Sequence, residues 1–241
     1  MHDNVKIFIL YTMIAVIDSG MGGLTTLAAL IHAHADHRFA YYADVAHAPY
    51  GALSRYAILE AVRHAADEVC RQGADGIVLG CNTATLAALH YLQGALSVPV
   101  WGVAPPVDEA VTHGGKTLLV GTEYTCRRYR GRAHLAVCAL PQLATMVDEG
   151  ADAARIEAYC RPILAGYAPT DNLVLGCTHY LLVREVLGRI TRATHITDGH
   201  ARLIEALGRA PSAGGVGVDI LSNGAVDAAR YLHTLGRLLE I

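Results

Sequence analysis

Two cysteines of this 241-residue chain stand in matching local sequences and could act as a pair of acid/base groups. Cys81 follows the apolar run 76–79, Cys177 follows the apolar run 172–175, and each is preceded by Leu-Gly and followed by a small polar residue. The spacing between them is about that of a small domain, which predicts two related halves. A thiolate on one face of a carbon centre and a thiol on the other could remove a proton and return one with inversion.

The elements that must position these cysteines follow from the hydrophobic pattern. Short aliphatic and β-branched runs alternate with Ala- and Leu-rich segments of helical length, which predicts an α/β fold with mostly parallel sheets. We expect strands near 14–17, 39–42, 76–79, 99–103, 117–120, 134–137, 172–175 and 194–197. We expect helices over 23–33, 53–72, 83–93, 105–112, 124–131, 141–147, 151–166, 180–190, 199–208 and 224–239.

Both cysteines then fall just after the carboxyl end of a strand, which is where open parallel sheets bind ligands. Each also stands at the start of a predicted helix, where free N–H groups can lower the pKa of a thiol. A third turn of this kind, Asp-Ser-Gly-Met-Gly-Gly at 18–23, offers backbone N–H groups and a hydroxyl. Its glycines fit neither a phosphate loop nor a dinucleotide fingerprint, so we expect it to bind a carboxylate.

Cofactor chemistry is not expected from the composition. The two lysines, Lys6 and Lys116, both precede predicted strands and lie away from the crevice, so a pyridoxal phosphate Schiff base is not predicted. Six cysteines without a Cys-x-x-Cys pair indicate neither disulfides nor a zinc ribbon. We expect no metal; the histidines of the polar stretch 32–37 would at most form a weak site and are interpreted as part of a solvated loop.

The overall composition excludes further classes of protein. With 53% hydrophobic and 17% charged residues the chain can bury a large core, and a net charge of −3 offers no basic surface for nucleic acid. The apolar stretch within 7–17 is too short to span a bilayer and lacks a cleavage pattern. We therefore expect a cytoplasmic protein with a small-molecule partner, in which residues 1–12 are a leader peculiar to this chain.

Taken together, the motifs resemble the glutamate racemase branch of the aspartate/glutamate racemase superfamily. The resemblance is carried by 18–23, Asp44 with 48–51, 81–84, 98–103, Gly121-Thr122 with Thr125, 176–180 and Asp198-Gly199. It implies two doubly wound α/β domains related by a pseudo-twofold axis, with the substrate between them. We expect the first domain to comprise 1–104 plus 214–241 and the second to comprise 105–213.

The resemblance also implies an activity and the residues that carry it. It implies cofactor-independent interconversion of L- and D-glutamate, supplying D-glutamate for peptidoglycan, in a homodimer. Cys81 would deprotonate D-glutamate and Cys177 L-glutamate, with Asp18 and His179 tuning the two thiols. The residues that it places around the substrate are Ser19, Pro49, Tyr50, Gly51, Asn82, Thr83, Thr122, Thr125 and Thr178.

The chain departs from the family pattern in two segments. The family has a glutamate in the segment that matches 147–150, and the best register puts Asp148 there, with Glu149 one place along. The segment 126–129 does not align, so the local pocket wall is expected to differ.

Alternatives remain within and beyond the superfamily. Aspartate racemases differ by a glutamate where this chain has His179, and arylmalonate decarboxylases and maleate isomerases are more distant. A regulatory protein of the same fold would lack turnover. A hydrolase that pairs Cys177 with His179 would leave Cys81 unexplained.

Overall fold

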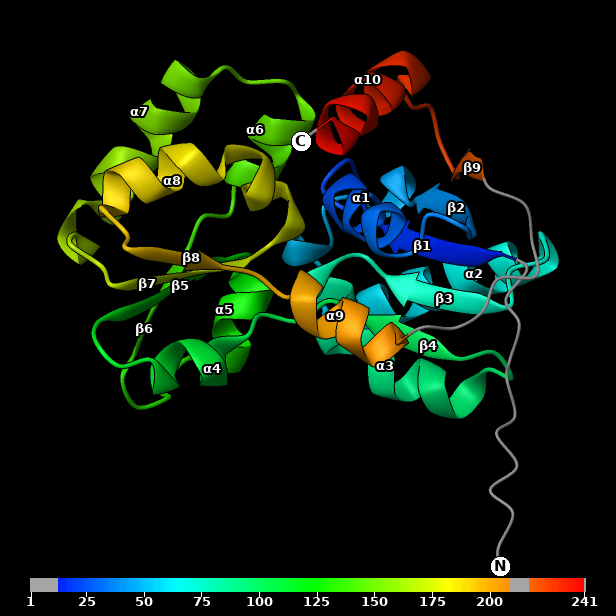
Figure 1. The fold of residues 1–241 in the computed structure, drawn as a ribbon, viewed down its shortest axis with the longest axis horizontal. Coiled ribbons are helices and arrows are strands. Elements are labelled where there is room, and N and C mark those ends of the chain that lie inside the picture. Colours follow the sequence, from blue (N-terminus) through cyan, green and yellow to red (C-terminus); the bar gives the residue numbers. More distant parts are fainter. Residues whose placement is uncertain (1–12, 209–216, 241) are drawn as a thin grey trace, which may run out of the picture.

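The chain forms two parallel sheets that lie side by side, each covered by helices on both faces (Figure 1). The computed structural model describes residues 13–208 and 217–240. The strands are β1 Ile14–Asp18, β2 Arg38–Ala43, β3 Gly76–Leu79, β4 Val100–Gly102, β5 Thr117–Gly121, β6 Leu135–Ala139, β7 Asn172–Gly176, β8 His195–Thr197 and β9 Gly217–Ser222.

The helices alternate with these strands along most of the chain. The α-helices are α1 Leu24–Ala33, α2 Arg55–Arg71, α3 Asn82–Ala95, α4 Val107–Thr112, α5 Glu123–Tyr129, α6 Leu143–Asp148, α7 Ala153–Leu164, α8 Arg184–Thr191, α9 His200–Leu207 and α10 Ala228–Leu239. Short 3₁₀ helices are η1 Val45–His47, η2 Tyr50–Ala52, η3 Ala165–Tyr167 and η4 Thr178–Val183. None of the helices in the described part of the chain is long and apolar enough to cross a membrane.

The two sheets share one strand order, which confirms that the chain contains two related halves. The first sheet has the order β4-β3-β1-β2-β9 and the second, read from β8, has the order β8-β7-β5-β6. The pairings recorded between their strands are parallel. In both halves the chain runs from the central strand, β1 or β5, outward to β2 or β6 and then turns back to β3 or β7, so the switch points lie between β1 and β3 and between β5 and β7. Ligands bind at such switch points, outside the carboxyl ends of the strands.

Apolar side chains explain why these layers hold together. The first sheet buries one face against α2 and α3 and the other against α1, α9 and α10. The second sheet packs against α6, α7 and α8 on one face and against α4 and α5 on the other. Strands β1, β3, β5 and β7 are buried along their whole length, as expected for parallel strands covered on both faces.

The predicted α/β class with parallel sheets is confirmed, and the eight expected strands are all present. The strand β9 was not predicted; it pairs with β2 at the edge of the first sheet. The expected helix over 180–190 is shorter, because the turns after Cys177 form the 3₁₀ helix η4 before α8 begins at Arg184. The proposed leader, residues 1–12, lies outside the described residues.

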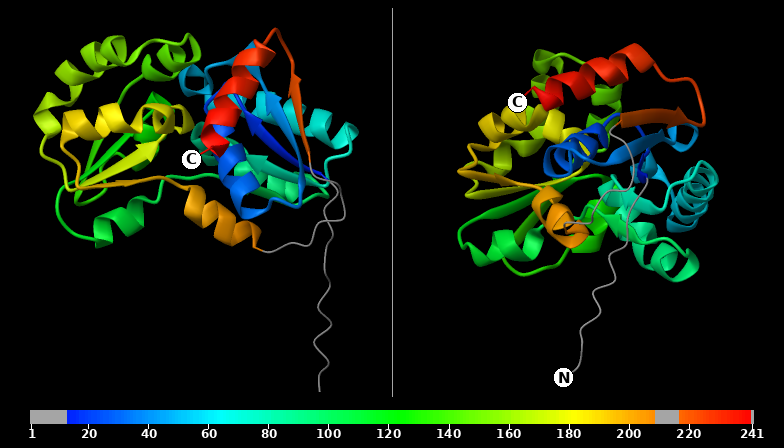
Figure 2. Two further views of the ribbon diagram at one scale, coloured as in Figure 1. Left: turned by 45° about the horizontal axis from the view of Figure 1, so that its top comes forward. Right: turned by 45° about the vertical axis from the view of Figure 1, so that its right-hand side comes forward.

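The last helices return to the first half of the molecule. Helix α10 lies along α1 and reaches α6 of the second half (Figures 1 and 2). Helix α9 packs on α1 and β4, and its Leu203 and Leu207 belong to the core of the first sheet. The domain division at 104 and 213 remains a prediction, and the packing of α9 favours a second crossing near Asp198.

Candidate active site

Four of the expected site residues stand at the two switch points of the sheets. Asp18 ends β1 and Cys81 follows β3, the neighbouring strand of the first sheet. Thr122 follows β5 and Cys177 follows β7, the equivalent pair in the second sheet. Both thiols are buried, with 7% of Cys81 and 6% of Cys177 exposed. The fold therefore brings one cysteine from each half to the carboxyl edge of its own sheet.

The Cys177 side of the site contains an imidazole and a carboxylate. His179 Nδ1 lies 3.8 Å from Cys177 Sγ, and His179 Nε2 lies 3.1 Å from both carboxylate oxygens of Asp148. Cys177 is the extended residue that precedes η4, and from there its sulfur lies beside the ring of His179 although the two residues are two positions apart. The ring therefore connects the thiol to the end of α6.

The surroundings of His179 favour its protonated form. Burial by itself favours the neutral ring, but the carboxylate of Asp148 and the sulfur of Cys177 raise the pKa of His179 well above its usual value. Burial likewise opposes ionisation of Asp148, but His179 and the Met21 N–H hold its pKa below the usual value. The Gly22 N–H lies 3.2 Å from Nε2 and could donate only to an unprotonated nitrogen. If Nε2 carried no proton, its lone pair would face the carboxylate of Asp148. The carboxylate therefore favours the imidazolium, in which Nε2 is protonated.

Two glycines of the 18–23 turn let the second half approach the first. A Cβ atom at Gly22 would lie 2.3 Å from His179 Nδ1, and one at Gly20 would lie 2.6 Å from a carboxylate oxygen of Asp148. The Met21 N–H between them donates to that carboxylate over 3.1 Å. The turn expected to bind a substrate carboxylate thus also binds the carboxylate of Asp148.

The Cys81 side of the site contains the carboxylate of Asp18. Asp18 is fully buried; its Oδ1 accepts from the Gly20 N–H at 2.8 Å and its Oδ2 accepts from the Thr178 hydroxyl at 3.2 Å. Burial raises the pKa of Asp18 to about 6, against the opposing effects of His179 and these hydrogen bonds. Thr178, expected to contact substrate, therefore joins the second half to this carboxylate.

The expected lowering of the thiol pKa by the helix start is wrong for Cys81. Burial, and then the negative charge of Asp18, raise the pKa of this thiol well above its usual value, and the N–H groups of Ala84 and Thr83 only partly oppose them. Desolvation of a thiolate at a site with 7% exposure outweighs the few backbone dipoles at the start of α3.

Three threonine hydroxyls, contributed by both halves of the molecule, form a cluster at the site. Thr83 Oγ1 lies 3.0 Å from Thr122 Oγ1 and 3.5 Å from Thr125 Oγ1, and the Thr122 hydroxyl also caps α5 by accepting from the Thr125 N–H at 3.2 Å. A Cβ at Gly51 would lie 2.6 Å from Thr122 Cβ, so a glycine is needed for this approach. This hydroxyl cluster offers several donors to an anionic ligand.

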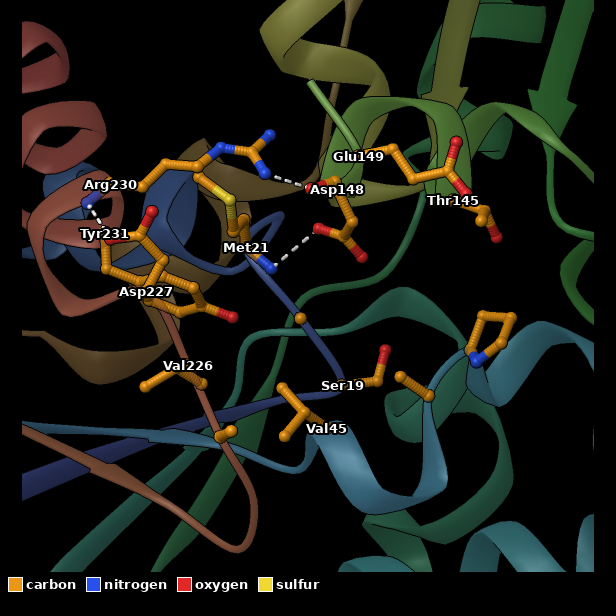
Figure 3. Close-up of a pocket in the computed structure, with 14 residues that line it drawn as sticks. Ser19, Met21, Val45, Thr145, Asp148, Glu149, Val226, Asp227, Arg230 and Tyr231 are labelled. Carbon is orange, nitrogen blue, oxygen red and sulfur yellow. Dashed lines mark hydrogen bonds between the residues drawn. The ribbon is translucent and has the colours of Figure 1, made fainter. Parts of the chain in front are cut away.

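Of the remaining expected residues, two line a cavity and two donate hydrogen bonds to other parts of the first half. A cavity of about 340 Å³ is lined by Ser19, Pro49 and Asp148, among others (Figure 3). The Tyr50 hydroxyl donates to Asp44, and the Asn82 amide donates to the carbonyl of Val103 over 3.3 Å.

Asp148 and Glu149, the two acidic residues of the segment 147–150, differ in their surroundings. The side chain of Asp148 is 31% exposed and faces His179. The side chain of Glu149 is 55% exposed and lies 3.7 Å from the guanidinium of Arg155, away from the imidazole. The unaligned segment is the end of α5, in which Cys126 is fully buried and the arginines are exposed.

Sequence reasoning missed three residues around this site. Arg230 of α10 donates to backbone carbonyls at the end of α6, Asn223 donates to Asp44, and the Tyr41 hydroxyl donates to the carbonyl of Gly20 over 2.6 Å. All three act on backbone atoms or on a buried carboxylate, and no short motif surrounds them. The apolar and aromatic run of β2 was the one available signal, and it marks Tyr41 as a core residue.

The histidines of the 32–37 stretch lie away from the site. His34 and His37 are buried, so the interpretation of these two as part of a solvated loop is wrong; their rings are in edge contact at 5.4 Å. His32 is exposed at the end of α1. Across the described ranges, 13–208 and 217–240, there is no group of three or more histidine, cysteine or acidic side chains able to hold a metal ion.

Comparison with known proteins agrees with this arrangement. Residues 18–207 match the family model described as Asp/Glu/Hydantoin racemase. A glutamate racemase of Leptospira interrogans is 35% identical over 207 residues, covering 80% of each chain. The structure of glutamate racemase from Thermus thermophilus in complex with beta-chloro-D-alanine is 32% identical, with a TM-score of 0.75 over 95% of this chain and 93% of that one. The fold also matches Campylobacter jejuni glutamate racemase, with a TM-score of 0.80 at 23% identity over 95% and 99% of the two chains.

The paired sheets, the buried cysteines and these matches define the class of protein, an isomerase that acts on amino acids. The chain belongs to the glutamate racemase branch of the Asp/Glu/Hydantoin racemase family.

Proposed function

We propose that this protein interconverts L- and D-glutamate by proton transfer between the substrate and two cysteines, without an organic cofactor or metal ion. The observation that carries the proposal is the placement of Cys81 and Cys177 at equivalent switch points of two facing halves, each with its own charged neighbour. The names of the relatives supply the substrate.

In the direction from L- to D-glutamate, Cys177 acts as the base. The positive charge of His179 next to its sulfur stabilises the thiolate. The thiolate takes the α-proton, so the Cα–H bond breaks while an S–H bond forms and the electron pair stays on the α-carbon. Cys81, kept as a thiol by burial and by Asp18, then gives its proton to the opposite face.

The reverse direction uses the same atoms with exchanged roles. Cys81 must then be the thiolate, and Asp18, with its pKa of about 6, is the neighbouring group able to receive a proton near neutral pH. The hydroxyl cluster of Thr83, Thr122 and Thr125 and the turn at 18–23 would hold the substrate carboxylates. Preorganised donors of this kind stabilise the developing carbanion.

The wider role follows from the activity. Supply of D-glutamate for peptidoglycan would make the protein a cytoplasmic enzyme of cell wall formation and cell shape. Assembly as a homodimer remains part of this proposal.

The test is circular dichroism of L-glutamate, D-glutamate and both aspartate enantiomers incubated with the purified protein. We expect both glutamate signals to decay to zero without added pyridoxal phosphate and in the presence of EDTA, while the α-hydrogen exchanges with solvent deuterium. Dependence on added cofactor would contradict cofactor independence, and faster decay of the aspartate signals would make it an aspartate racemase. Absence of any exchange would favour a regulatory protein.

A further inference from the structure

Helix α10 sends one arginine across to the second half of the molecule. The helix begins at Ala228 after Asp227, whose carboxylate accepts from the Arg230 N–H over 3.0 Å. Its Tyr231 and Leu235 are buried in the core of the first sheet, which fixes the helix to the first half. Arg230 points away from that core, toward the end of α6 (Figure 3).

The guanidinium of Arg230 binds the last carbonyls of α6. Nη2 donates to the carbonyl of Val147 over 2.8 Å, and Nη1 donates to the carbonyl of Asp148. Carbonyls in the last turn of a helix have no partners within the helix, and an arginine can donate to two of them at once. Gly150, two residues after Asp148, has a φ of +78°, and a Cβ there would lie 3.2 Å from Nη2. The turn is therefore shaped to leave room for the guanidinium.

Asp148 is held in place through both its backbone carbonyl and its side-chain carboxylate. Its carbonyl accepts from Arg230, while its carboxylate accepts from the Met21 N–H and lies 3.1 Å from His179 Nε2. Fixing the carbonyl of a residue fixes the direction in which its side chain leaves the backbone, because both are attached to the same Cα atom. The positive charge also adds to the effects that keep Asp148 ionised. A side chain of the first half thus sets the position of the Asp148 carboxylate, which faces the imidazole of His179 in the second half.

Resting on the racemase activity proposed above, we propose that Arg230 is a positioning residue for the Cys177 half of the reaction, holding the end of α6 so that Asp148 meets His179. Its loss lets the carboxylate move away from the imidazole and weakens the base that acts on one enantiomer. The Cys81 half, whose neighbours are Asp18 and Thr178, is left unchanged.

Racemisation alone cannot test this proposal, because the equilibrium constant fixes the ratio of kcat/KM in the two directions. An irreversible reaction separates the halves. With the two threo enantiomers of 3-chloroglutamate, one cysteine takes the α-proton, the Cα–H electron pair forms a Cα=Cβ bond, and chloride leaves. The enamine then takes up water and gives 2-oxoglutarate and ammonia, so that 2-oxoglutarate reports each cysteine separately.

Arg230→Met is compared with Arg237→Met, which removes an exposed arginine from the same helix. We expect Arg230→Met to slow elimination from the enantiomer served by Cys177 by about ten- to a hundredfold, since misplacing a catalytic group by about 1 Å can cost that much. The other enantiomer should change less than twofold, and Arg237→Met should match wild type with both. The Cys81→Ser and Cys177→Ser variants identify which enantiomer belongs to which cysteine.

The conservative variant Arg230→Lys keeps the charge but reaches one carbonyl at a time, so we expect a loss of about two- to fourfold on the same enantiomer only. If Arg230→Met does not fold, Arg230→Lys against Arg237→Lys decides the question alone. A second readout is the pKa of His179, measured by NMR of the imidazole nitrogens, which should fall in Arg230→Met as the carboxylate moves away.

Equal slowing of both enantiomers would mean that Arg230 is merely structural, and no slowing of either would remove it from the account. Both results overturn the proposal while wild-type racemisation stands. A wild-type protein that neither racemises glutamate nor eliminates chloride would overturn the proposed function, and this inference with it.

Discussion

The two cysteines occupy equivalent places in the fold but very different electrostatic surroundings. Cys81 lies next to the buried carboxylate of Asp18, and Cys177 lies 3.8 Å from an imidazole that Asp148 keeps charged. Both thiols are buried, but Cys81 has a carboxylate beside it and Cys177 has an imidazole. Related halves can place a pair of groups symmetrically, while their neighbours give each group its own ionisation state.

The asymmetry suits a reaction that needs one thiolate and one thiol at the same moment. Two identical environments would favour equal ionisation of both sulfurs, and either pair of equal states is inactive for inversion. Here burial and Asp18 favour the thiol form of Cys81, while Cys177 has the imidazole of His179 beside its sulfur. Hydrogen bonds of the two carboxylates also join the halves of the molecule. The Thr178 hydroxyl donates to Asp18, and the Met21 N–H donates to Asp148. Closing the two halves together therefore assembles both environments.

The largest expected effect comes from removing either thiol. Cys81→Ser and Cys177→Ser should each reduce racemisation of glutamate by at least about a thousandfold, because a serine hydroxyl is far too weak an acid to become the resting base. Circular dichroism of both enantiomers measures the loss. Cys70→Ser, a half-buried thiol on α2 outside the site, is the control and should keep wild-type activity. A near wild-type rate in either active-site variant would contradict the pairing.

Substitution of the residue beside each thiol should slow elimination from one enantiomer only. Asp18→Asn should slow elimination from the 3-chloroglutamate enantiomer served by Cys81, and His179→Asn should slow the other, each by about a hundredfold. Each variant is the control for the other because both are buried at the same interface. If both variants slow the same enantiomer, the assignment of one neighbour to each cysteine is wrong.

The buried carboxylate of Asp18 should also make the stability of the protein depend on pH. Its pKa is raised from 3.8 to about 6 in the folded protein, so its contribution to stability is fully present below about pH 4 and is lost as the pH rises through 6. The shift corresponds to about 3 kcal/mol, because one pKa unit is about 1.4 kcal/mol. Asp18→Asn should therefore raise Tm relative to wild type at pH 7.5 and not at pH 4. The same difference in Tm at both pH values would contradict the burial argument.

A smaller effect should separate the two acidic residues at the end of α6. Asp148→Asn should reduce kcat by about tenfold or more, since it removes the charge that holds His179 protonated, while Glu149→Gln should change it less than twofold. Steady-state kinetics of racemisation measures both. The reverse order would transfer the auxiliary role to Glu149, and two unchanged variants would remove it from both.

Much of this arrangement could be predicted from the sequence because it depends on local patterns. The Leu-Gly-Cys repeats after apolar runs predicted where Cys81 and Cys177 stand, and the alternation of strand and helix patterns predicted both sheets. The glycines at 20 and 22 were recognised as a turn. Their second use, leaving room for Asp148 and His179 of the other half, depends on packing between segments more than 120 positions apart.

Other features had no local signal. The strand β9 follows a glycine-rich stretch and is fixed by its pairing with β2 at the sheet edge, which its own pattern does not reveal. Arg230 acts on two backbone carbonyls, and backbone acceptors leave no trace in a sequence. The raised pKa of Cys81 depends on how deeply its sulfur is buried, and the helix start alone indicated the opposite direction.

The central claim, one base for each face of the substrate, is tested most directly by elimination from the two threo enantiomers of 3-chloroglutamate in Cys81→Ser and Cys177→Ser. Each variant keeps one intact thiol and should release 2-oxoglutarate from one enantiomer only, with opposite preferences in the two variants. The resemblance to the family implies that Cys177→Ser retains the D-enantiomer and Cys81→Ser the L-enantiomer. If both variants process the same enantiomer, the two-base account is wrong and a single base must serve both faces.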